Sequence, residues 1–172
     1  MAWHAIYTRA RWEKKVYQQL LEKDIETYLP LRKTLKQWSD RKKWVEEPLF
    51  RSYIFVNVEP DSYFEALNVQ GAMRYVTIRG KACVIPQQQI DAVKLFLEQD
   101  GEILSHEITL EKHSEVEIIA GVLQGLKGVV KEIGNSNRVY ILIESVGRMV
   151  SVEIPGNNLR PVSSVNRKHD KS

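Results

Sequence analysis

Residues 48–56 read Pro48-Leu49-Phe50-Arg51-Ser52-Tyr53-Ile54-Phe55-Val56. This run of aromatic and β-branched side chains predicts a strand, which is entered through a short polar break at Arg51 and Ser52. Side chains alternate between the two faces of a strand, so Tyr53 and Phe55 share one face and Ile54 lies on the other. We expect Tyr53 and Phe55 to point outward and Ile54 to point into the core. A strand this apolar is either buried on both faces or keeps one face for a partner.

The sequence on either side of this strand predicts an α/β sandwich of about 100 residues. Apolar residues alternate with a two-residue period in three further stretches and recur at helical spacing in three others. The predicted strands are 3–8, 25–30 and 73–78, and the predicted helices are 12–23, 61–67 and 86–99. The charged stretch 32–47 predicts a projecting hairpin or a long loop.

A different pattern follows a polar connection near residue 100. Short strands separated by turn residues are predicted at 116–119, 128–133, 138–143 and 149–154. Strands of this length imply a small β-barrel. The apolar residues of 122–133 also fall at helical spacing, so an amphipathic helix is the alternative there. Its interior glycines would each cost that helix about 1 kcal/mol relative to alanine, so we expect the barrel.

Composition excludes several classes of protein. The chain has 172 residues, is 43% hydrophobic and contains 9 Gly and 6 Pro, which is typical of a folded globular protein. No apolar stretch approaches the roughly 20 residues of a membrane helix, and the first residues do not form a signal peptide, so we expect a cytoplasmic protein. Cys83 has no partner for a disulfide. The four histidines lack ligand spacing, so we expect neither a metal nor a cofactor.

The charge is concentrated in the first part of the chain. The net charge is only +3, but basic residues exceed acidic ones in 9–51 and acidic residues exceed basic ones in 52–110. One basic cluster consists of Arg9, Arg11, Lys14 and Lys15, and another of Arg32, Lys33, Lys36, Arg41, Lys42 and Lys43. Such runs most often form a solvated face, and nucleic acid is the leading functional alternative because Lys and Arg bind phosphates.

The second basic cluster is interleaved with two tryptophans. Trp38 and Trp44 flank the segment Ser39-Asp40-Arg41 in the expected hairpin. Aromatic side chains in a basic segment can stack on bases, but we expect these two to pack across the hairpin or onto the rest of the domain.

Three motifs in this order resemble the NusG family of transcription elongation factors over about residues 2–162. The opening Trp3-His4-Ala5-Ile6-Tyr7 is similar to the family's first strand, and residues 48–56 are similar to its Pro-x-Phe-x-x-Tyr-hydrophobic-x-Val signature. Residues 116–133, with Gly128, are similar to the KOW motif. The resemblance implies an α+β protein with an N-terminal NGN sandwich and an SH3-like KOW barrel. The boundaries we expect are 1–100 for the NGN domain, 101–110 for a linker, 111–162 for the KOW domain and 163–172 for a polar tail.

One departure from the family pattern narrows the comparison. General members usually carry Pro-Gly before the signature tyrosine, whereas this chain has Arg51 and Ser52 there. In this respect it is closer to the specialised RfaH-like antiterminators, which act on particular long operons such as those for surface polysaccharides.

The resemblance also implies partners. Family members dock the NGN domain on the clamp helices of bacterial RNA polymerase, and Phe50, Tyr53 and Phe55 are the matching positions. RfaH-like members contact the non-template DNA strand, for which the matching positions are Tyr7, Arg9, Arg11, Lys14, Lys15, Gln70 and Arg74. The KOW domain of the family recruits Rho or a small-subunit ribosomal protein. Candidate contacts here are Val122, Leu123 and Leu126, for which a role in the core is an equal alternative. In one RfaH subgroup this domain is instead a helical hairpin that masks the polymerase site.

Two other classes of protein are alternatives to this one. A ribosome-associated KOW protein that binds RNA could carry the same barrel and basic clusters, but it would not need the aromatic signature. An enzyme is not expected, because no nucleophile–base pair, carboxylate pair or phosphate-binding loop stands out. We expect a monomeric transcription elongation or antitermination factor, with a general NusG-type factor as the alternative.

Overall fold

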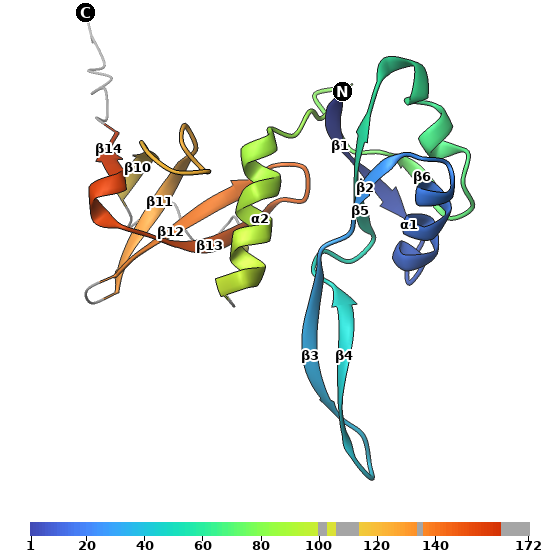
Figure 1. Ribbon diagram of the computed structural model, residues 1–172, viewed down its shortest axis with the longest axis horizontal. Helices are drawn as coiled ribbons and strands as arrows, with labels where there is room; N and C mark the ends of the chain where they lie inside the picture. Colours follow the sequence, from blue (N-terminus) through green and yellow to red (C-terminus); the bar gives the residue numbers. More distant parts are fainter. Residues whose placement is uncertain (100–102, 106–113, 134–135, 163–172) are drawn as a thin grey trace, which may run out of the picture.

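A computed structural model describes residues 1–99, 103–105, 114–133 and 136–162. Its first sheet is antiparallel, with four strands in the order β2-β5-β1-β6 (Figure 1). These strands are β1 (Ala2–Thr8), β2 (Glu26–Tyr28), β5 (Tyr53–Val58) and β6 (Ala72–Tyr75). The strand predictions at 3–8 and 25–30 are confirmed. Neighbouring residues of β1 on opposite faces, such as Ala5 and Ile6, are both fully buried, as expected for a sheet that is covered on both faces.

The run at 48–56 is not one strand. Pro48 is the last residue of strand β4 (Lys42–Pro48), a turn follows, and β5 begins at Tyr53. Ser52 has a φ of 64°, in the left-handed region that side chains other than glycine rarely adopt. The polar pair Arg51–Ser52 therefore marks a change of chain direction between two strands.

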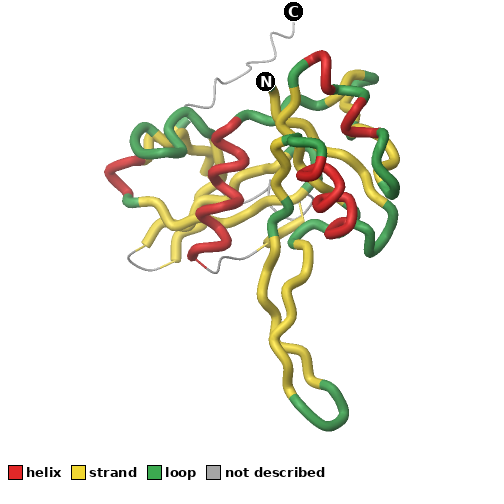
Figure 2. The backbone as a smooth tube through the Cα atoms, turned by 45° about the vertical axis from the view of Figure 1, so that its right-hand side comes forward, coloured by secondary structure: helices red, strands yellow, loops and turns green. Residues whose placement is uncertain are grey.

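Strand β4 pairs with β3 (Leu31–Gln37) to form a long hairpin. This hairpin projects away from both sheets, as Figures 1 and 2 show. Its prediction from the charged stretch 32–47 is confirmed, because few of its side chains are apolar enough to be drawn into a core.

Both faces of β5 are covered. Helix α1 (Glu13–Glu22) lies on one face, where Ile54 packs in a core with Val16 and Leu20. On the other face Phe55 is fully buried in a second core that includes Phe50. The alternation was predicted correctly, but the outward orientation of Phe55 was wrong, because elements distant in the sequence cover this face.

The covering elements are helix α2 and the second sheet. Helix α2 (Gln87–Gln99) contributes Ile90, Val93 and Phe96 to the same core as Phe55. Its prediction over 86–99 is confirmed. The end of α2 is hydrogen-bonded to strand β13 (Arg148–Ile154) of the second sheet, since the Glu153 amide donates to Gln99 Oε1 over 2.8 Å.

The second sheet is antiparallel, with six strands in the order β14-β10-β11-β12-β13-β9. Its strands are β9 (Ile103–Ser105), β10 (Ser114–Ile118), β11 (Lys127–Ile133), β12 (Ser136–Ile143), β13 (Arg148–Ile154) and β14 (Leu159–Pro161). Strand β9 lies within the segment expected as a linker. The other residues of 101–110, and the tail 163–172, lie outside the described residues.

The α+β class and the small β unit are therefore as expected. The alternative, a helix over 122–133, is wrong. Residues 127–133 form β11, which pairs with β12 from Val129↔Tyr140 to Ile133↔Ser136. A Cβ on Gly128 would lie 2.6 Å from a Val139 methyl carbon and 2.8 Å from the Tyr140 carbonyl oxygen. This close strand approach needs a glycine and favours the sheet over the helix.

Two smaller predictions differ from the structure. The helix at 61–67 is replaced by two short 3-10 turns, η1 (Pro60–Ser62) and η2 (Glu65–Leu67). The strand at 73–78 is divided into β6 and β7 (Thr77–Ile78), which forms its own hairpin with β8 (Lys81–Ala82). In the described part of the chain, no helix is long and apolar enough to cross a membrane.

Candidate docking face and nucleic-acid interface

The docking face predicted by the signature consists of Phe50, Tyr53 and Phe55. The Phe50 and Phe55 rings are perpendicular, with centroids 6.1 Å apart, and Tyr28 stacks on Phe55 at 6.3 Å. Phe50 is 5% exposed, Phe55 is fully buried and Tyr53 is partly buried. The structure thus brings the three aromatic residues together, but only Tyr53 reaches the surface.

A turn of the second sheet covers this face. Val146, in the turn between β12 and β13, and Arg148, the first residue of β13, line a cavity of about 420 Å³ with Leu49, Phe50, Arg51 and Tyr53. Val146 is 8% exposed and belongs to the same core as Phe50. In this arrangement the aromatic residues contact the C-terminal part of the chain instead of a partner.

Tyr53 lies at the edge of the docking face, next to Tyr7 and Arg74, which belong to a basic surface described below. Its ring centroid is 4.9 Å from that of Tyr7, and the Arg74 guanidinium carbon lies 4.7 Å from the Tyr7 ring centroid. Burial, together with the hydrogen bond to Tyr7, raises the pKa of Tyr53 to about 12. Tyr53 is therefore neutral at physiological pH and can enter an apolar interface without an ionisation cost.

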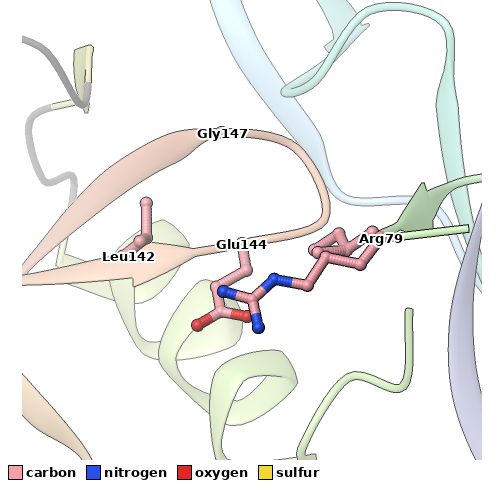
Figure 3. Close-up of a pocket in the computed structure, with 5 residues that line it drawn as sticks. Arg79, Leu142, Glu144 and Gly147 are labelled. Carbon is pink, nitrogen blue, oxygen red and sulfur yellow. The ribbon is translucent and has the colours of Figure 1, made fainter. Parts of the chain in front are cut away.

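The β7–β8 hairpin forms a second contact between the N-terminal part of the chain and the second sheet. Ile78 and Arg79 line a cavity of about 600 Å³ with Leu142, Glu144 and Gly147 of the second sheet. Figure 3 shows the side chains of Arg79 and Glu144 pointing toward each other. Burial, and to a lesser degree Glu144, raises the pKa of the Cys83 thiol.

A buried carboxylate fixes the turn of the signature. Glu13 is 5% exposed, and its Oε1 accepts a hydrogen bond of 2.8 Å from the Ser52 amide. The Ser52 carbonyl in turn accepts from the Thr8 amide over 2.9 Å. These bonds hold Ser52 in its left-handed conformation and attach the turn to the first turn of α1.

The basic surface is formed around Trp12, at the start of α1. The Lys15 ammonium lies 4.5 Å from the centre of the Trp12 ring system and the Arg9 guanidinium lies 5.9 Å from it. Both arrangements place a cation over an aromatic ring, which restrains the two cations at the surface. Arg11, at a φ of 65°, is exposed beside them.

Residues 70–74 complete this surface. Gln19 Oε1 accepts from the Gln70 amide over 3.0 Å, and Gln19 Nε2 donates to the Gln70 carbonyl over 2.9 Å. The Arg9 amide donates to the Gly71 carbonyl over 2.9 Å. Arg74 reaches the same surface through Tyr7, so all the predicted nucleic-acid residues except Lys14 are adjacent to this loop or to Trp12.

Lys14 turns toward the hairpin instead. Its ammonium donates to the Glu46 carbonyl over 2.8 Å. The pattern of basic residues did not reveal the supporting residues Glu13, Trp12 and Gln19, because each was assigned only to a helix. The sequence shows Glu13 only as an acid at the start of the helix, and its burial and its bond to Ser52 appear only in the structure.

The predicted contacts of the barrel are in different environments. Val122 is 73% exposed, in the turn that precedes β11. Leu126 is partly buried, and Leu123 is 2% exposed and packs in the core. Of the three, Val122 is the most exposed, and the buried Leu123 has the core role that was the equal alternative to a partner contact.

Comparisons with known proteins agree with the fold. A family model described as transcription termination factor NusG matches residues 1–94. The transcription termination/antitermination protein NusG of Lactococcus lactis subsp. lactis (strain IL1403) is 23% identical over 176 residues, which are 94% of this chain and 94% of that protein. A solved structure described as "Domain interaction in Thermotoga maritima NusG" has 20% sequence identity and a TM-score of 0.50, covering 94% of this chain and 97% of its own. The last comparison concerns the fold alone.

Proposed function

The chain belongs to the NusG family of transcription factors, and from this premise we propose that it binds bacterial RNA polymerase through its N-terminal domain and suppresses pausing or termination. The observation that carries the proposal is the aromatic group formed by Tyr53 and Phe55 of β5 and Phe50 of the preceding turn. Such a group fits an apolar surface on a partner protein, since aromatic residues dominate desolvated interfaces. In this proposal the clamp helices of the polymerase provide that surface.

The C-terminal unit must leave the docking face before the polymerase can bind. Val146 contacts the site where the clamp helices would dock, and the two surfaces cannot occupy it together. The proposed units are an N-terminal domain of residues 1–100 and a KOW domain of 111–162, joined by 101–110. The solved Thermotoga maritima NusG is likewise described by a domain interaction.

The basic surface supports contact with the non-template DNA strand. Arg9, Lys15 and Arg74 present cations. The partly exposed Tyr7 can stack on unpaired bases and the exposed Gln70 can bond to them. This surface adjoins Tyr53, so a polymerase docked on the aromatic face would hold exposed DNA close to it.

The turn at Arg51–Ser52 supports a specialised, RfaH-like role on particular operons such as surface polysaccharide loci. Ser52 has the backbone conformation of a glycine, and Glu13 holds it there. A general NusG-type factor is the alternative. In either case we propose that the released KOW domain recruits Rho or a small-subunit ribosomal protein, with Val122 at the contact.

Replacing Tyr53 by alanine tests the docking face. We expect Tyr53→Ala to weaken binding to a purified polymerase elongation complex about 30-fold, because a central aromatic residue contributes roughly 2 kcal/mol or more. Tyr53 is only partly buried, so the domain should remain folded. The affinity would be measured by titrating labelled full-length protein into the complex.

Phe64→Ala is the matched control. Phe64 is an aromatic residue that is 72% exposed and lies between η1 and η2, away from the docking face. Its replacement should leave the affinity unchanged. Equal affinities of the Tyr53 variant and the wild type would show that the docking face has been assigned to the wrong residues.

Replacing Arg9 and Arg11 together tests the DNA contact. Each arginine that binds a phosphate contributes to the salt dependence of affinity, so the double alanine variant should lower the slope of log affinity against log salt by about 1.4 for a single-stranded contact. The measurement is recruitment to elongation complexes that carry an exposed non-template strand, repeated over a salt series. An unchanged slope would exclude these arginines from the contact. Binding to ribosomal RNA without any polymerase binding would favour the ribosome-associated alternative.

A further inference from the structure

The β3–β4 hairpin carries two tryptophans that do not pack in any core. Trp38 is 56% exposed and Trp44 is 66% exposed. The expectation that they would pack onto the rest of the domain is wrong, because the hairpin extends beyond both sheets (Figure 2). The cross-strand neighbour of Trp44 is Leu35, which is itself 48% exposed.

The register of the hairpin places basic side chains around each tryptophan. Residues two apart share a face, so Trp44 lies beside Lys42 and opposite Leu35. Trp38 is on the other face, with Lys36, and its amide donates to the Arg41 carbonyl over 2.7 Å at the tip. Each face of the hairpin therefore presents one indole ring next to a lysine, and on the Trp44 face Glu46 lies on the other side of the ring.

Several of these cations are not neutralised by the protein. Lys36 forms an ion pair with Glu47. In contrast, four exposed basic residues have no ion pair with any other residue that the structure describes. They are Lys33, Arg41, Lys42 and Lys43. Exposed cations without acidic partners attract phosphates and release their counterions on binding.

We propose that the distal part of this hairpin, residues 33–44, binds single-stranded nucleic acid. Trp38 and Trp44 stack on unpaired bases, and the four exposed cations bind the phosphates on either side. Alternating cations and aromatic rings are the chemistry with which proteins bind single strands without strong sequence preference. Duplex nucleic acid fits less well, because its base faces are already stacked and leave the indoles without partners.

The proposed path of the nucleic-acid strand continues from the hairpin onto the body of the protein. Lys14 bonds to the Glu46 carbonyl, and a cavity of about 530 Å³ lies between the hairpin and the start of α1. Four basic residues line it, Arg11, Lys14, Lys36 and Arg51, together with the acidic residues Glu13, Glu46 and Glu47. An apolar protein surface would fit this hairpin less well than nucleic acid. Among the described residues 33–44, Leu35 and Trp44 form the only apolar cross-strand pair, and lysines lie beside it.

The test measures binding of the full-length protein without polymerase. Fluorescence anisotropy would be recorded with labelled oligo-dT, oligo-U and a blunt DNA duplex of equal length. We expect the variant Trp38→Ala/Trp44→Ala to bind single strands at least tenfold more weakly. Lys42→Gln/Lys43→Gln should reduce the salt slope by about 1.4. Whichever of oligo-dT and oligo-U binds more tightly identifies the strand as DNA or RNA.

Two matched controls separate this site from general charge effects. Lys81→Gln/Lys127→Gln removes the same charge from exposed positions elsewhere, and it should leave the salt slope and the affinity near wild type. Trp38→Phe/Trp44→Phe keeps an aromatic platform and should retain much of the binding. Tighter binding to the duplex, or unchanged affinity of the tryptophan double alanine variant, would overturn the proposal. These outcomes do not depend on polymerase binding, which is tested separately through Tyr53.

Discussion

Val146→Lys is expected to release the C-terminal domain and strengthen polymerase binding at least tenfold. Val146 is 8% exposed and packs in the core that contains Phe50. A lysine there would bury an unpaired charge beside Arg51 and Arg148, which line the same cavity, and this costs several kcal/mol. The closed arrangement would lose most of its stability, whereas the open form would hold the new charge in water. If the closed state dominates in the wild type, more protein becomes able to bind.

Cys83 offers a direct measure of this opening. It is the single cysteine of the chain, and burial and Glu144 both raise the pKa of its thiol. Separation from Glu144 lowers that pKa, so Val146→Lys should make Cys83 react several-fold faster with a disulfide reagent at neutral pH. X-ray scattering should show a larger radius of gyration.

Val122→Lys is the control for this experiment. It places the same charge on a residue of the same unit that is 73% exposed. Its affinity, thiol reactivity and scattering should match those of the wild type. If Val146→Lys behaves like this control, the contact between the turn and the docking face does not limit polymerase binding.

Gly71→Ala is expected to destabilise the protein by about 2–5 kcal/mol. Gly71 has a φ of 96°, and a Cβ there would lie 2.7 Å from a ring carbon of Trp12 and 3.1 Å from a Val16 methyl carbon. Either the loop or the tryptophan must move, and both belong to the basic surface. The free energy of unfolding would be measured by chemical denaturation.

Gly80→Ala isolates the backbone contribution. Gly80 has a similar φ of 78°, but a Cβ there meets no atom within 4 Å. This variant should lose only the backbone strain, about 1 kcal/mol. A loss for Gly71→Ala no larger than for Gly80→Ala would show that Trp12 does not confine this loop.

Local patterns predicted most of the elements. The strands β1 and β11 to β13, the helices α1 and α2 and the projecting hairpin follow from periodicity and charge, because these depend on neighbours in the sequence. Strands β9 and β14 were not predicted; they are the two edge strands of the second sheet, and each has only three residues. The turn within 48–56 was only marked as a polar break, because an apolar residue at position 50 serves a turn as well as a strand.

The candidate site was predictable in its residue types but not in its supports. The cluster of Arg9, Arg11 and Lys15 is visible in the sequence. The cation-binding position of Trp12 and the bond from Ser52 to Glu13 are not, since each joins segments that only folding brings together.

The opposite orientation of Ile54 and Phe55 in β5 follows from the sequence alone, because alternation is a property of the extended backbone. The exclusion of the polar hairpin from a core follows from the sequence as well. Which faces of the sheet are covered depends on tertiary contacts. Phe55 is buried and Trp44 exposed because a large apolar side chain is sheltered only where elements such as α2 and the β12–β13 turn meet it, and those contacts join residues far apart in the chain.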